Sequence, residues 1–149
     1  MNLRLKFDVT PENAAALADE IVQSAKRVDG IALDYTEESI EKIDSVIESF
    51  RRENVPLESI AETLFCAGCY VGEVFVRNGR GVWKKTEDTG MKGFASAPMV
   101  VQIGPDSACN PIDKAFKRME NGDADSLAYF YFGFAHRCPG KKPWWRFWK

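Results

Sequence analysis

Three of the four cysteines and the only histidine have types and spacings that could bind a metal ion. Cys66 and Cys69 form a Cys-x-x-Cys pair, and His136 and Cys138 form a His-x-Cys pair near the end of the chain. Three thiolates and one imidazole are a known ligand set for zinc. The first pair could instead serve thiol chemistry, although redox pairs of this spacing follow a strand and begin a helix. In the alternative interpretation the cysteines pack as small apolar side chains.

A carboxylate supplies the second candidate for chemistry. Glu73 has mostly apolar neighbours, and burial can raise the pKa of a carboxyl group until it serves as a base. Arg77 follows four residues later, which is the spacing of a helical ion pair, so we interpret the two as structural. The chain contains no nucleophile elbow, and the glycine-rich segment 79–85 lacks the spacing of a phosphate loop. We therefore expect no catalysis and no cofactor.

A third candidate is a group of polar and basic residues on a predicted helix and a predicted strand. Together they could form a basic patch for an acidic partner, although such charges are more often a solvated helix face. The group consists of Lys84, Lys85, Asn110, Lys114, Lys117 and Arg118.

The tail, residues 136–149, concentrates basic and aromatic side chains. Its formal charge is +5, whereas that of residues 1–135 is −7. Tryptophan interleaved with lysine and arginine suits a membrane surface, and the same residue types dominate protein interfaces. In a third interpretation the tail docks in a groove of the acidic body. The predicted partner contacts are Trp144, Trp145, Arg146, Phe147 and Trp148.

The element that must position these candidates is the segment 56–83. Pro56 suits the first turn of a helix, and apolar residues then recur at spacings of three and four. A helix this apolar should be buried at the centre of the fold. Glu62 and Glu73 interrupt the apolar run, so we do not interpret it as a membrane span. Residues 70–76 also follow an alternating pattern rich in β-forming residues, so a strand is an alternative for this part of the segment.

Five residues of this segment are predicted to have structural roles. Two glycines one helical turn apart would let another backbone approach closely. The glutamate and arginine form the expected ion pair, and a tryptophan follows the turn that ends the helix. These residues are Gly68, Gly72, Glu73, Arg77 and Trp83.

The remaining chain predicts four further helices, three strands and one long loop. Capping residues, first-turn prolines and apolar periodicity place the helices, and alternation places the strands. We expect strands over 3–7, 82–86 and 98–103, a long loop over 87–97, and a shorter loop over 104–110. We expect a helix from Thr10 to Val28, with Val28 facing inward and Gly30 as terminator. Further helices are expected from Thr36 to Asn54, from Asn110 to Asn121, and after a cap at Asp123 or Asp125.

Composition predicts one α+β domain over residues 1–135, with about five helices around a buried central helix, a small antiparallel sheet, and the tail. The net charge of −2 indicates no nucleic-acid partner. The amino terminus does not read as a signal peptide, so we expect a cytoplasmic protein with free thiols.

One ordered set of motifs resembles a known family. Residues 68–73 read GCYVGE, a GxYxGE pattern; GRGVW follows at 79–83, and NPIDKAFKR at 110–118 matches NPxxKxxKR. Over about residues 35–131 the chain resembles small bacterial proteins of unassigned function, some encoded near toxin and immunity genes. The resemblance implies a cytosolic α+β domain and supplies no catalytic residues. The cysteine pair and the tryptophan-rich tail lie outside the pattern.

These observations predict a cytoplasmic protein-binding module with an immunity-like role. One alternative is a zinc-binding protein or thiol-dependent enzyme that uses Cys66, Cys69, His136 and Cys138. The other is a peripheral membrane protein anchored by its tail.

Overall fold

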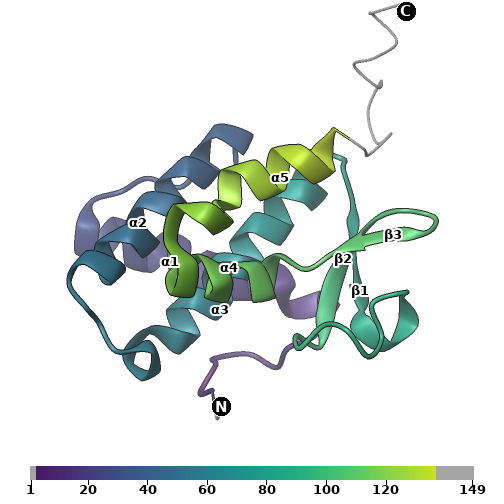
Figure 1. Cartoon of the computed structure of the whole chain (residues 1–149), viewed down its shortest axis with the longest axis horizontal. Helices are drawn as coiled ribbons and strands as arrows, with labels where there is room; N and C mark the ends of the chain where they lie inside the picture. Colours follow the sequence, from purple (N-terminus) through teal and green to yellow (C-terminus); the bar gives the residue numbers. More distant parts are fainter. Residues whose placement is uncertain (1–2, 137–149) are drawn as a thin grey trace, which may run out of the picture.

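Helix α3, Leu57–Arg77, runs through the centre of the protein (Figure 1). The computed structural model describes residues 3–136. Within this range, five α-helices and a three-stranded antiparallel sheet form one α+β domain around a buried helix, which confirms the predicted fold class. The other elements are α1 (Ala14–Ser24), α2 (Ile40–Arg52), α4 (Pro111–Asn121), α5 (Leu127–Ala135), β1 (Val82–Lys85), β2 (Met99–Gly104) and β3 (Ser107–Cys109).

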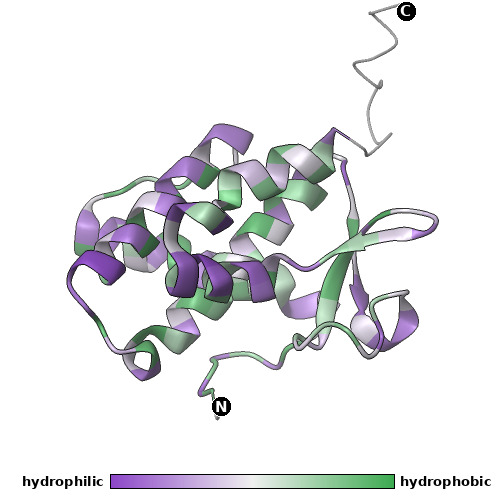
Figure 2. Cartoon of the chain, in the orientation of Figure 1, coloured by the Kyte–Doolittle hydropathy of each residue, from purple (hydrophilic) through white to green (hydrophobic). Residues whose placement is uncertain are grey.

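Helix α3 is buried because its neighbours cover nearly all of its surface. It contacts the other four α-helices and strands β1 and β2. Hydrophobic residues concentrate on α3 and β2, and hydrophilic residues on the outer helices (Figure 2). By length and composition alone α3 could cross a membrane, but 78% of its apolar stretch is buried inside the protein. The part that could also have been a strand, 70–76, is helical throughout.

Side-chain caps begin three of the predicted helices. The Oγ1 atoms of Thr10 and Thr36 accept hydrogen bonds from the amides of Asn13 and Ser39, at 3.3 Å and 3.2 Å. Asn110 Oδ1 accepts from an amide of α4 at 3.0 Å. These bonds satisfy amides that have no partner inside the helix. The first helix stops at Gly30, whose φ of +66° suits glycine.

The sheet lies to one side of the helices, with β2 at its centre (Figure 1). Strands β1 and β2 are antiparallel, and Trp83 pairs with Val101. Strand β3 pairs with β2 on its other edge, where Cys109 faces Val101. Strands 82–86 and 98–103 were therefore predicted correctly, whereas β3 falls in a segment predicted as a loop.

Two predictions near the amino terminus are wrong. Residues 3–7 contain no strand. Their alternation is typical of a strand, but the amide of Arg4 instead donates to Glu62 Oε2 at 3.0 Å. Val28, predicted to face inward, is 71% exposed. The helix widens into a π-helical turn over Ala25–Asp29, which shifts the side chains after Ser24 out of the earlier register.

The cap of the last helix also differs from the prediction. Ser126, rather than Asp123 or Asp125, caps α5 by accepting a hydrogen bond from the amide of Tyr129 at 3.3 Å. The two aspartates lie in a 3-10 turn over Gly122–Asp125 that precedes it.

Candidate functional site

The three described residues of the proposed zinc set do not form a ligand cluster. Cys66 and Cys69 are buried on α3, and His136 is exposed at the carboxyl end of α5. Within residues 3–136, no group of three or more histidine, cysteine, aspartate or glutamate residues is placed to hold a metal ion. Cys138 lies outside the described residues.

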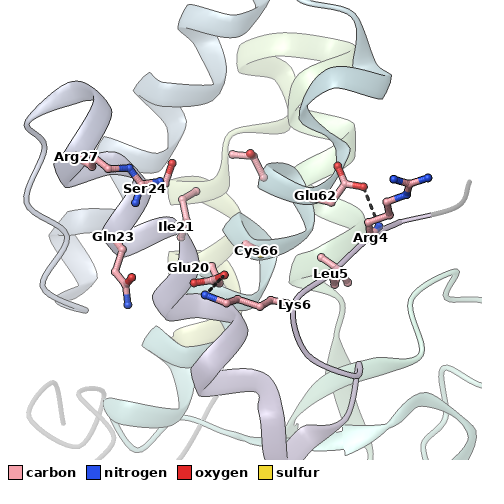
Figure 3. Close-up of a pocket in the computed structure, with 11 residues that line it drawn as sticks. Arg4, Leu5, Lys6, Glu20, Ile21, Gln23, Ser24, Arg27, Glu62 and Cys66 are labelled. Carbon is pink, nitrogen blue, oxygen red and sulfur yellow. Dashed lines mark hydrogen bonds and ion pairs between the residues drawn. The ribbon is translucent and has the colours of Figure 1, made fainter.

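A cavity of about 310 Å³ reaches Cys66 from the surface between α1, α3 and the amino-terminal segment (Figure 3). Charged side chains of both signs line its entrance. Lys6 and Glu20 form an ion pair at 3.8 Å, and Glu62 accepts from the Arg4 amide. The carboxylates therefore already have partners, and the cavity has no single charge sign that would select a ligand.

The environment of the two thiols makes them poor nucleophiles. Burial raises the pKa of Cys66 to about 12, helped by the negative charges of Glu20 and Glu62. Burial also raises the pKa of Cys69 well above its usual value. Thiolates are the reactive species, so neither side chain has the lowered pKa of a catalytic cysteine.

This environment predicts slow alkylation. The pKa of Cys66 moves from 9.0 to about 12. At about pH 8 its thiolate fraction falls roughly a thousandfold, and iodoacetamide should label Cys66 at least about 100-fold more slowly in the native than in the unfolded protein. Labelling should accelerate about tenfold per pH unit up to the pKa. Peptide mapping by mass spectrometry measures the rate; equal native and unfolded rates would contradict the prediction.

Glu73 is fully engaged in structural contacts. One carboxylate oxygen accepts from Arg77 Nε at 3.1 Å, and the other accepts from Trp83 Nε1 at 2.9 Å. The carboxylate is buried and joins the last turns of α3 to strand β1. These contacts occupy both oxygens, so Glu73 is not placed as a general base.

The two glycines of α3 permit two different close approaches. A Cβ atom on Gly68 would lie 2.4 Å from the Cα of Ile112, at the start of α4. A Cβ atom on Gly72 would lie 2.1 Å from the ring of Trp83. The first glycine therefore admits a backbone, as the spacing suggested, and the second admits an aromatic side chain instead.

Two residues of the basic group suggested by the sequence are engaged by acidic side chains. Arg118 is only 2% exposed and contacts Asp44, Glu48 and Asp123. Lys114 Nζ pairs with Asp125 at 2.6 Å. Acidic residues from α2 and the turn before α5 therefore cover Arg118 and Lys114, whereas Lys84, Lys85 and Lys117 are exposed.

Contacts that sequence reasoning missed hold α5 in place. Glu37 accepts hydrogen bonds from the hydroxyl of Tyr131 and, at 2.7 Å, from Arg80 Nε. At the other end of α5, Asp44 accepts from the amides of Leu127 and Ala128 at 2.8 Å and 3.0 Å. Helix α5 is thus anchored by half-buried carboxylates of α2 and of the 3-10 turn Glu37–Ser39 before it.

The outer side of this anchored helix exposes aromatic rings. Tyr129 is 84% exposed and Phe132 is 37% exposed, beside the exposed Gly133. Phe130 and Phe134 lie on the other flank of the helix, where they border a cavity shared with the long loop. We call Tyr129, Phe132 and Gly133 the outer face of α5.

Exposed carboxylates lie on α2 and on the 3-10 turn Glu37–Ser39 that precedes it. Glu41 is four residues after Glu37, in the turn before α2, and three before Asp44; both of these contact α5, so Glu41 lies on the same side of α2. Glu38 and Glu41 are exposed, and neither side chain forms an ion pair within residues 3–136. The surface around α5 therefore combines exposed aromatic rings with unpaired negative charge.

The predicted partner contacts of the tail, residues 144–148, lie outside the described residues. No protein-family model matches the chain, and neither the curated proteins nor the solved structures include a significant match.

Proposed function

We propose that the protein is a cytoplasmic, non-enzymatic binding module that recognises a basic protein partner in an immunity-like role. The observation that carries this proposal is the outer face of α5. Two large aromatic side chains are exposed there on a helix whose opposite side is anchored. Exposed apolar patches on a rigid element are typical of protein interaction sites, and tyrosine is common among interface hot spots.

The charge of the protein supports a basic partner. Residues 1–135 have a formal charge of −7, and Glu41, on the side of α2 that contacts α5, is exposed. Carboxylates at the rim of an interface accelerate association with a positively charged partner and exclude acidic ones. The tail residues Trp144, Trp145 and Trp148 follow α5 in the chain and are proposed to join this surface when the partner is bound.

The test is pairwise binding between the full-length protein and the purified products of genes adjacent to its own, measured by isothermal titration calorimetry. We expect one basic product to bind. Replacing Tyr129→Ala and Phe132→Ala together should weaken that binding by about 30-fold or more, equivalent to roughly 2 kcal/mol. Removing aromatic anchors at the centre of an interface has effects of this size.

Val28→Ala is the matched control, because Val28 is exposed at the end of the first helix and does not line the outer face. It should leave the dissociation constant unchanged. Circular dichroism should show that both variants remain folded at the temperature of the titration. Binding that is insensitive to the double substitution, or that Val28→Ala weakens equally, would contradict the proposed surface.

A further inference from the structure

A second surface lies on the opposite flank of α5, where the long loop, the β2–β3 hairpin and Phe134 enclose a cavity of about 500 Å³. This volume is in the range of ligand-binding pockets. Met91, Ile103 and Phe134 supply apolar lining, and Asp88 and Asp106 supply two exposed carboxylates. We call it the hairpin cavity.

The charge of the hairpin cavity is unbalanced. Its lining includes Asp88 and Asp106 but no lysine, arginine or histidine. Neither aspartate forms an ion pair or side-chain hydrogen bond within residues 3–136. An occupant that combines aromatic rings with positive charge would satisfy both the carboxylates and the apolar lining.

One segment of the chain has this chemistry and begins at the cavity. The part of the tail from residue 137 onward contains three tryptophans, one phenylalanine and five basic residues. It starts three positions after Phe134, which lines the cavity. In Figure 1, α5 ends on the side of the molecule where the hairpin lies. An extended chain covers about 3.3 Å per residue, so residues 141–148 can reach the cavity without any change in the body.

We propose that residues 137–149 dock in the hairpin cavity of their own chain. The tail aromatic rings lie against Met91 and Phe134, and its lysines lie beside Asp88 and Asp106. This inference concerns an intramolecular contact and stands apart from the proposed partner, because its test needs no partner.

The tail itself supplies a readout, since trypsin cuts after lysine and arginine. Arg137, Lys141 and Arg146 mark cleavable bonds in the full-length protein. The cleavage rate tracks the population of undocked tail. Replacing Asp88→Lys and Asp106→Lys should therefore increase the rate of tail removal, followed by intact mass spectrometry, by about fivefold to tenfold, as expected for two exposed charge pairs.

The control makes the same change in charge elsewhere. Asp29 and Glu53 are exposed and line neither the hairpin cavity nor the cavity beside it. Asp29→Lys with Glu53→Lys should leave the cleavage rate unchanged. Adding Lys141→Glu and Lys142→Glu to the variant that carries Asp88→Lys and Asp106→Lys should restore protection, because the pairing of charges is reversed. Arg137 and Arg146 remain cleavable in that rescue variant.

Three outcomes would overturn the inference. The first is a tail cut equally fast in the native protein and in the Asp88→Lys, Asp106→Lys variant. The second is protection of the tail from trypsin that disappears when the protein is diluted, which would mean that the tail docks on a second copy of the chain. The third is protection of the tail from trypsin only when anionic lipid vesicles are added, which would mean that the tail binds a membrane surface.

Discussion

Replacing Arg118→Met should destabilise the protein by about 3 kcal/mol, because breaking a buried ion pair by removing one partner leaves the other charges uncompensated. Arg118 Nε donates to Asp44 Oδ1 at 3.0 Å, and its two terminal nitrogens donate to Glu48 at 2.9 Å and to Asp123 at 3.1 Å. Methionine preserves much of the apolar stem but supplies no donor. Urea unfolding followed by circular dichroism measures the change in the free energy of unfolding.

Arg52→Met is the matched control, because Arg52 contacts the same Glu48. Its side chain is 78% exposed and the two charged atoms are 3.9 Å apart. An exposed pair of this kind contributes about 0.5 kcal/mol or less, so Arg52→Met should be nearly neutral. Combining Arg118→Met with Asp44→Asn should cost less than the sum of the two single changes. Equal costs for Arg118→Met and Arg52→Met would show that burial of the guanidinium contributes nothing.

The same cluster predicts a sensitivity to acid. The hydrogen bond from Arg118 holds the pKa of Glu48 below its usual value of 4.5. A carboxylate whose pKa is lower in the folded state stabilises the protein above the unfolded pKa, and this contribution is lost as the pH falls through the folded value. The unfolding free energy of the native protein should therefore decline below about pH 4.5, and it should decline less steeply in Arg118→Met.

Helix positions were predictable where the signal is local. Thr10, Thr36 and Asn110 begin helices because a capping side chain satisfies amides a few residues away. Gly30 ends one because it accepts a positive φ. The apolar periodicity of residues 57–77 predicted a buried helix, since only the interior can accommodate an apolar surface on nearly all sides.

Features that depend on a distant partner were not predictable from the same patterns. The alternation of residues 3–7 resembles a strand, but no strand of the described chain lies beside it. Arg118 was assigned to a solvated basic face because periodicity groups residues without showing what covers them. Two of the acidic residues that contact it lie on α2. Asp44 is 74 positions earlier in the chain, and Glu48 is 70 positions earlier.

The candidate site also combines features that the sequence reveals with features that depend on distant contacts. The sequence singled out the cysteines, Glu73 and the tail, because their residue types are distinctive. The outer face of α5 was missed as a surface, since LAYFYFGFA is apolar throughout and shows no amphipathic period. Which rings are exposed is decided by Glu37 and Asp44, which anchor one side of α5 and leave Tyr129 outside.

Gly68→Ala should destabilise the protein by about 1–3 kcal/mol, although alanine is the better helix former by about 1 kcal/mol. The added methyl group would lie 2.4 Å from Ile112 Cα and 3.0 Å from both Ile112 N and Pro111 O. These are backbone atoms at the start of α4, where Asn110 caps the helix. A backbone cannot rotate away as a side chain does, so α3 and α4 must separate or the cap must break.

Gly133→Ala makes the same chemical change where the structure has room. A Cβ atom on Gly133 meets no heavy atom within 4 Å, and the residue lies in the interior of α5. Helix propensity alone should then operate, and the protein should become more stable by up to about 1 kcal/mol. Urea unfolding of both variants therefore separates packing from propensity by the sign of the change. If both glycine substitutions stabilise the protein, the close approach of α3 and α4 is not what requires glycine at position 68.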